Sequence, residues 1–489
     1  MLAVVYYFCL AGLLLTLSLV APILVALLAG EAVIAQRLVL YLLLGSFLFA
    51  GPVLATISRV QRTPQIGSLV LVGLVWLVLP VMAAIPILDI TDLGVVDSLF
   101  ESVSGLTTTG ASVVTTLDAM PQSLIFWRIQ LQWIGGFLAL MTIFAVIAPL
   151  GIGGIILSSK SSSGRAGTMA GEGRMRELAW NFGVFYVAIT AVAFLALFLS
   201  GIRAFHAACL AMTAISTGGF LPFEVALDTV LGPIGLAVFT IFLIFGATSV
   251  FWHRMLFRWQ VSRLKQHRES YSVLVLIVAV GLLLAATLVR VSGIQADGVS
   301  SILIEGMMNG ASLVSTSGIE SRPGIFQLLH LPIVLLVIVI GGSAYSTSGG
   351  LKHYRMGAMA VQSWSELDRL VYPRAVRPSR FGTQRFNLEL MKAIWSFAAV
   401  AIFVICMGTL LIAWSNVPFE AAFTAAIAAF STAGPVYNSG WAAPGSEAWP
   451  AYSDFGTTGK WAIMALMLLG RLEVLVLLGL FSRHYWRNR

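Results

Sequence analysis

Long apolar runs recur along the whole chain, separated by short polar connections. At about 1.5 Å per residue, each run is long enough to cross the ~30 Å hydrocarbon core of a bilayer as a helix. They predict transmembrane helices at residues 3–29, 38–58, 66–88, 125–157, 178–200, 230–257, 271–292, 329–362, 388–414 and 457–483. The first run lacks a basic start and a nearby small-residue cleavage site, so we interpret it as a retained helix rather than a signal peptide. The pattern predicts an all-α polytopic membrane protein.

Four shorter apolar stretches interrupt this series, and each ends in small hydroxyl residues and glycine. The endings are Thr107, Thr108, Thr109, Gly110; Ser216, Thr217, Gly218, Gly219; Ser315, Thr316, Ser317, Gly318; and Ser431, Thr432, Ala433, Gly434. The stretches before them, such as 96–106 and 204–215, are too short to span a bilayer and too apolar for exposed loops. Re-entrant pore helices fit both facts, because irregular backbone is tolerated at membrane depth only where protein buries it or it lines a cavity. One such cluster would more simply be a helix-packing site, but four matched copies favour a shared pore.

Glycine and hydroxyl residues in this pattern suit the binding of a dehydrated cation. Glycine permits φ values that other residues resist, so carbonyl oxygens can turn inward, and Thr and Ser can add hydroxyl oxygens. Divalent-cation pores commonly use carboxylate rings, and none of the four endings contains Asp or Glu. The sequence therefore predicts a filter for a monovalent cation. Its predicted residues are Thr108, Thr109, Gly110, Ser216, Thr217, Gly218, Thr316, Ser317, Gly318, Thr432, Ala433 and Gly434.

The run at 329–362 is interrupted by a stretch rich in glycine and serine. It predicts a broken helix whose freed backbone groups must be satisfied inside a bundle or a cavity, below the filter. The predicted gate residues in it are Gly341, Gly342, Ser343, Thr347, Gly349 and Gly350. The simpler alternative is a flexible helix end near the cytoplasm. Shortening the loop separates the two, because only a gate predicts a higher flux.

Arg471 lies about halfway along the last apolar run. A guanidinium at this depth costs at least ~2.5 to 3.5 kcal/mol on insertion scales, so it should face a pore or a partner rather than lipid. Glu473 is two residues away and lies on a different helix face, which disfavours an intrahelical pair. As a gate residue, Arg471 would raise the barrier to a passing cation. The alternative is that it ties helices together through backbone carbonyls or through Glu473 of a neighbour.

Composition and charge narrow the class of protein. With 58% hydrophobic and 10% charged residues, the chain cannot form one soluble domain. The net charge of +8 could indicate nucleic-acid binding, but the basic residues gather in every second connection, at 59–62, 160–176, 254–268 and 352–385. Acidic residues occupy the connections between them. By the positive-inside rule, this pattern predicts that both termini are cytoplasmic, and it argues against a nucleic-acid partner.

No motif predicts an enzyme or a resident cofactor. Cys9, Cys209 and Cys406 fall in apolar segments, where a thiol behaves as a small hydrophobe. The six histidines show no paired metal-ligand spacing, and the GxxxxGK[ST] phosphate-binding pattern does not occur. The main alternative to a channel-like protein is a proton- or sodium-coupled secondary cation transporter, which would place ionisable residues inside the membrane.

Three segments carry a resemblance to a known family. Residues 100–111, 132–136 and 468–473 are similar to the Trk/Ktr/HKT superfamily of potassium transporters, and most closely to its bacterial TrkH branch. The resemblance covers nearly the whole chain. It implies two N-terminal transmembrane helices (1–65) before four tandem helix, pore-loop, helix repeats around a pseudo-fourfold pore. The repeats would lie at 66–157, 178–257, 271–362 and 388–489, the third containing an intramembrane gating loop.

The resemblance also implies a function. In this superfamily a glycine in the first filter goes with potassium preference, so Gly110 implies K⁺ uptake across the bacterial cytoplasmic (inner) membrane, and serine there should relax discrimination against sodium. Members carry a gating loop and a pore arginine that match residues 341–350 and Arg471. They form homodimers and bind cytoplasmic nucleotide-binding regulatory subunits of the TrkA type. The proline- and glycine-rich outer loop from Pro435 to Asp454 departs from the pattern and has no assigned role.

Overall fold

The structure, a computed structural model, describes residues 2–59, 65–144, 172–257, 259, 268–292, 298–372, 380–381, 384–385, 388–442 and 447–472. Within these residues the regular structure is helical, apart from one antiparallel pair of two-residue strands, β1 (Arg380–Phe381) and β2 (Gln384–Arg385). The predicted all-α class is confirmed. Glu473 and the parts of predicted spans at 145–157 and 473–483 lie outside the described residues.

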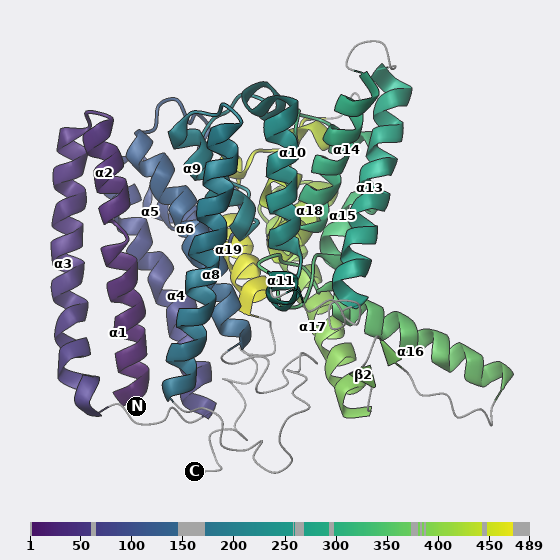
Figure 1. Cartoon of the computed structure of the whole chain (residues 1–489), viewed down its shortest axis with the longest axis horizontal. Coiled ribbons are helices and arrows are strands. Elements are labelled where there is room, and N and C mark those ends of the chain that lie inside the picture. The colour runs from purple at the N-terminus through teal and green to yellow at the C-terminus, as the bar shows by residue number, and fades with distance from the viewer. Residues whose placement is uncertain are drawn as a thin grey trace.

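Eight stretches among the described residues are long and apolar enough to cross a membrane. They are α1 with α2 (Leu2–Leu17 and Val20–Leu28), α3 (Ala32–Thr56), α4 (Gln65–Ile90), α6 (Gln122–Thr142), α8 (Glu172–Leu199), α10 (Leu227–Ala247), α13 (Arg268–Ser292) and α17 (Leu388–Ala413). These stretches confirm eight of the predicted crossings. In Figure 1 they stand side by side, with α1, α2 and α3 forming one flank.

The two other predicted crossings are shorter here. α15 (Leu331–Ile340) has 10 residues and is followed by an irregular loop, residues 341–352, and then by α16 (His353–Val371). Figure 1 shows α16 leaving the bundle sideways. The continuous span predicted at 329–362 is therefore wrong, and the broken helix predicted within it is confirmed. α19 (Thr457–Leu472) has 16 described residues.

Two further predicted spans are each divided into two helices. Between α1 and α2 the break precedes Pro22, which lacks the N–H needed for an α-helical bond and clashes with the preceding turn. The span predicted at 230–257 breaks at Thr248, and α11 (Val250–Phe257) begins after it. There the backbone bonds to the 341–352 loop instead, because Ala247 O accepts from Ser343 N at 2.9 Å and Val250 N donates to Tyr345 O at 3.0 Å.

Four short helices alternate with other helices in one closed ring of contacts. They are α5 (Val95–Leu106), α9 (Ala204–Ser216), α14 (Gly298–Val314) and α18 (Phe419–Phe430), and they confirm that the short apolar stretches are helices of their own. Three of them pack on a helix from the preceding part of the chain: α9 on α6, α14 on α10, and α18 on α15. The first, α5, packs on α19. The last pair closes the ring, since α5 and α19 come from opposite ends of the sequence.

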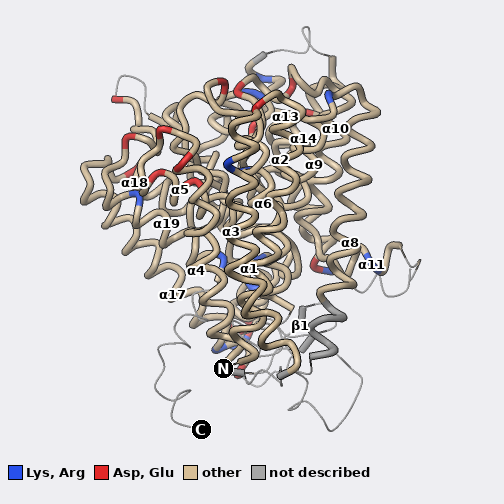
Figure 2. The backbone as a smooth tube through the Cα atoms, turned by 90° about the vertical axis from the view of Figure 1, so that its left-hand side faces the viewer, with Lys and Arg blue, Asp and Glu red and all other residues tan. Residues whose placement is uncertain are grey.

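Most acidic residues of the described chain gather at one end of the bundle. Figure 2 shows most of the Asp and Glu positions at the end away from the start of α1, around α5, α18 and the top of α13 and α14. Short 3-10 helices fill the connections: η1 (Ile57–Arg59), η4 (Phe326–Leu328), η5 (Gly434–Val436), η6 (Ser439–Trp441) and η7 (Tyr452–Asp454). The last three belong to the outer loop that follows α18.

Candidate ion pathway

The four short helices end in one and the same backbone turn. Within two residues after the end of each helix stands a threonine in the left-handed region, with φ of 57° at Thr108, 52° at Thr217, 62° at Thr316 and 54° at Thr432. A β-branched residue rarely adopts this conformation, which glycine usually occupies at a helix end. The same strained backbone conformation at the ends of all four helices indicates a functional constraint rather than chance.

The hydrogen bonds of these turns also repeat. The residue after each threonine donates its N–H to the carbonyl five residues earlier, as the Schellman motif requires. The bonds are Thr109 N to Ser104 O (2.9 Å), Gly218 N to Thr213 O (3.1 Å), Ser317 N to Ser312 O (3.0 Å) and Ala433 N to Ala428 O (2.8 Å). Each turn is thus held by its own helix. We call Thr108, Thr217, Thr316 and Thr432 the turn threonines.

When the four segments are aligned on the turn threonines, a different glycine of the second segment corresponds to the key glycines of the other three. Gly110, Gly318 and Gly434 each stand two residues after a turn threonine, and in the second segment Gly219 holds that position. Gly218 stands one residue earlier, beside Thr109 in the alignment. The pattern of a hydroxyl residue, threonine, a small residue and glycine was present in all four segments and could have identified Gly219.

The twelve predicted filter residues are all buried, and neighbouring segments bond to each other. Gly434 N donates to Thr109 O at 2.8 Å, and Ser317 Oγ donates to Gly218 O at 2.6 Å. A Cβ added at Gly110 would overlap the backbone of Gly219, so only glycine fits this contact. The structure therefore brings the four segments together in the centre of the ring.

The 341–352 loop lies directly against these turns. Gly349 N donates to the hydroxyl of Thr316 at 2.6 Å, and a Cβ at Gly349 would overlap Ser431 O and the hydroxyl of Thr432. Thr347 Oγ1 lies 3.4 Å from the hydroxyl of Thr217. The loop therefore contacts three of the four turn threonines, and two of the six gate residues predicted in it, Thr347 and Gly349, make these contacts.

Arg471 reaches the remaining turn threonine. Its Nε donates to Thr107 O at 2.9 Å, its Nη2 donates to the hydroxyl of Thr108, and its Nη1 donates to Ser348 O at 3.1 Å. The side chain is only 6% exposed. Arg471 thus joins the first turn to the loop through backbone carbonyls, as one of the two sequence-based alternatives expected. Lys352 Nζ donates to the same Ser348 carbonyl, so two cationic side chains meet there.

A buried ion pair behind the first segment was missed by the sequence analysis. Arg128 Nη2 lies 2.6 Å from Glu101 Oε2, and the two side chains are 3% and 0% exposed. Glu101 Oε1 accepts from Val113 N at 2.6 Å, and the Arg128 guanidinium lies 4.3 Å from the ring centroid of Phe220. The pair therefore links the backbone after Gly110 to the residue after Gly219. An arginine near the start of an apolar run was the signal that could have revealed it.

Removing one member of this pair should be strongly destabilising. Replacing Arg128 with Met leaves Glu101 buried without its partner, and we expect a loss of ~3–5 kcal/mol in stability. Arg37→Met is the matched control, because Arg37 and Asp89 form a pair at 3.3 Å with side chains 48% and 41% exposed. Exposed pairs contribute only ~0–1 kcal/mol. Thermal unfolding in detergent measures both, and equal losses in the two variants would contradict this account of Arg128.

Comparison with known proteins agrees with this arrangement. Residues 65–291 and 325–487 match the family model TrkH, described as a cation transport protein. The Trk system potassium uptake protein TrkH of Salmonella typhimurium is 30% identical over 86% of each chain, and that of Halomonas elongata is 27% identical over 97% of this chain and 96% of its own. The crystal structure of the potassium transporter TrkH from Vibrio parahaemolyticus superposes with a TM-score of 0.83 at 25% identity, covering 99% of both chains. The chain belongs to the TrkH family of cation transport proteins.

Proposed function

We propose that this protein takes up potassium across the bacterial cytoplasmic membrane, through a single path lined by the four segments that follow α5, α9, α14 and α18. The observation that carries the proposal is the fourfold recurrence of the strained threonine turn, with all four copies buried in one ring. The relatives named above are potassium uptake proteins, which supports K⁺ as the transported ion.

The helix geometry favours a cation at this place. All four short helices end at the turn threonines, so their C-terminal ends lie at the segments. A helix C-terminus carries about half a negative charge from its aligned peptide dipoles. Neutral carbonyl and hydroxyl oxygens can replace the water of a monovalent ion, and none of the four segments adds a carboxylate that would favour a divalent one. The ion that fits is an alkali cation.

The loop and Arg471 form the gate in this proposal. The loop packs against three turn threonines, and the positive charge of Arg471 lies beside the first one. A fixed positive charge on the path raises the barrier to a passing cation. The arrangement described here is therefore the closed one, and conduction requires the loop to leave the turns.

The expected topology and partners are part of the same proposal. Basic connections and the acidic end seen in Figure 2 support cytoplasmic termini by the positive-inside rule. A cytoplasmic nucleotide-binding subunit of the TrkA type is a proposed partner, supported by the Trk system to which the relatives belong. A second copy of the chain is proposed on the resemblance of the sequence alone. The exposed apolar side chains of the long helices face membrane lipid.

Ion flux into liposomes tests the proposed function. Purified protein is reconstituted, and uptake of potassium, rubidium, sodium and lithium is followed under an imposed voltage without a pH gradient. Voltage-driven flux of potassium and rubidium, with little sodium or lithium, is the expected result. Flux that strictly requires a proton or sodium gradient would instead establish the coupled secondary transporter, and absence of potassium flux under every gradient would refute potassium transport.

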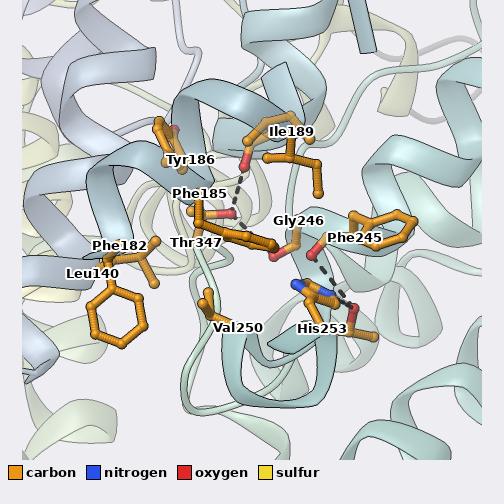
Figure 3. A pocket seen from close by; sticks show the side chains of 12 residues that line it. Leu140, Phe182, Phe185, Tyr186, Ile189, Phe245, Gly246, Val250, His253 and Thr347 are labelled. Carbon is orange, nitrogen blue, oxygen red and sulfur yellow. Dashed lines mark hydrogen bonds between the residues drawn. The ribbon is translucent and has the colours of Figure 1, made fainter. Parts of the chain in front are cut away.

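Thr347 supplies a prediction about loop release. Its single hydroxyl proton is shared between Ile215 O at 3.0 Å and Gly246 O at 3.1 Å. Figure 3 shows Thr347 beside Gly246 in a pocket of apolar and aromatic side chains. A hydrogen bond contributes about 1 kcal/mol, so Thr347→Val, which keeps the shape, should raise potassium flux roughly fivefold. Thr240→Val is the control, because the Thr240 hydroxyl bonds only within its own helix, to Leu236 O. Unchanged flux in Thr347→Val would show that these bonds do not hold the gate.

A further inference from the structure

The outer loop after α18 builds an aromatic cluster against the fourth segment. The ring of Tyr452 lies 4.9 Å from that of Tyr437 and 5.7 Å from that of Phe455. Trp449 stacks on Tyr437 at 5.8 Å, and Phe100, from α5, lies 5.7 Å from Tyr452. Tyr452 is only 6% exposed. The cluster therefore fixes Tyr452 between the outer loop and the helix that leads to the first turn.

The hydroxyl of Tyr452 reaches the fourth filter glycine. It donates a hydrogen bond to Gly434 O at 3.1 Å, across 18 residues of sequence. Burial raises the pKa of Tyr452 well above its ordinary value, so the hydroxyl keeps its proton and remains a donor at every physiological pH. No side chain of the described residues donates to the carbonyls of Gly110, Gly219 or Gly318. The fourth segment thus differs from the other three.

A second donor completes the environment of this carbonyl. Tyr437 N donates to Gly434 O at 3.1 Å, closing a tight turn over Pro435 and Val436. Proline favours such turns because its ring fixes φ near the value required at their second position. A carbonyl oxygen has two lone pairs, and here both are occupied. Pro435, which departs from the family pattern in sequence, therefore helps to turn this carbonyl toward the outer loop.

We propose that Tyr452 is a positioning residue for ion selectivity: it holds the Gly434 carbonyl away from the ion, so that the oxygens discriminating between cations at this level come from the other three segments. The inference rests on the proposed function of the same segments. It replaces the expectation that Gly434 supplies an oxygen equivalent to those of Gly110 and Gly318. In this proposal, the aromatic outer loop holds the fourth segment of the ion path in a fixed position.

The chain offers a closely matched pair of variants. Tyr452→Phe removes the bond to Gly434 O and keeps the ring, which releases the carbonyl to move toward the ion. Tyr437→Phe leaves the backbone N–H that donates to Gly434 O in place. It removes only the hydroxyl of a touching ring, which donates to Pro450 O in the outer loop at 2.7 Å. Both variants lose one tyrosine–carbonyl hydrogen bond, so a merely structural role predicts equal effects on thermal unfolding and on selectivity.

Rubidium and sodium flux in liposomes, measured beside thermal unfolding, tests the proposal. We expect the rubidium-to-sodium flux ratio of Tyr452→Phe to fall at least threefold, while Tyr437→Phe stays within error of the unmodified protein and both keep similar unfolding midpoints. A Tyr452→Phe ratio that is unchanged or higher, or an equal fall in Tyr437→Phe, would overturn it. If the unmodified protein shows no preference for rubidium over sodium, the proposed function of the segments fails instead.

Discussion

Replacing Gly110 with Ser is expected to lower the potassium-to-sodium flux ratio at least tenfold. Gly110 has a φ of +74°, and a Cβ there would overlap the backbone of Gly219. Backbone atoms cannot move aside as a flexible side chain can, so the first and second segments must separate. A wider path holds its oxygens too far apart to replace the water of potassium better than that of sodium. The liposome assay with both ions measures the ratio.

Gly30→Ser is the control that separates the effect of the Gly110–Gly219 contact from the effect of backbone strain at a positive φ. Gly30 has nearly the same φ, +77°, and nothing lies within 4 Å of an added Cβ. It stands between α2 and α3, away from the four segments. The control should lose a little stability and keep its selectivity. If Gly30→Ser and Gly110→Ser change the flux ratio alike, or if Gly110→Ser keeps the unmodified ratio, the contact with Gly219 has no role in discrimination.

Replacing Arg471 with Ala is expected to raise potassium flux at least tenfold. The change removes the positive charge beside Thr108 and the tether from Thr107 O to Ser348 O. Selectivity should stay within about twofold, because the backbone bonds of the first turn, such as Thr109 N to Ser104 O, do not involve Arg471. Liposome flux of potassium and sodium gives both quantities for the same preparation.

Arg471→Lys separates the effect of the positive charge from the effect of the hydrogen bonds that join the first turn to the loop. A lysine ammonium keeps the positive charge but lacks the planar fork with which arginine bonds several acceptors at once. If the charge is the main barrier, Arg471→Lys should conduct like the unmodified protein. Conduction equal to that of Arg471→Ala would assign the gate to the tether instead. Lower flux from a correctly folded Arg471→Ala protein would contradict a gating role altogether and make Arg471 a structural residue.

Local sequence patterns were sufficient to predict most of the helices. The apolar runs predicted the long helices, and the small hydroxyl residues with glycine marked the ends of the four short ones. Glycines 341, 349 and 350 correctly indicated a broken helix, because the loop needs positive φ at Gly341 and Gly350 and close approach at Gly349. In these places a residue's own conformational limits determine the structure.

Contacts between distant segments were not predictable in this way. The break at Thr248 depends on backbone bonds that join its neighbours Ala247 and Val250 to Ser343 and Tyr345, about a hundred residues later. The partners of Arg471 are carbonyls, which any residue type supplies. Tyr452 reaches Gly434 through an irregular outer loop without a hydrophobic period. Such contacts depend on how the ring of helices closes, which periodicity does not encode.

In the proposed function, the four threonine turns surround one ion path. The most direct test is a crystal structure of the protein with thallium or rubidium in place of potassium, in which anomalous scattering locates the ion. We expect an anomalous peak in the centre of the ring, within coordination distance of oxygens from the Gly110, Gly219 and Gly318 segments. A fully occupied peak elsewhere in the membrane region, with none among the four turns, would contradict it.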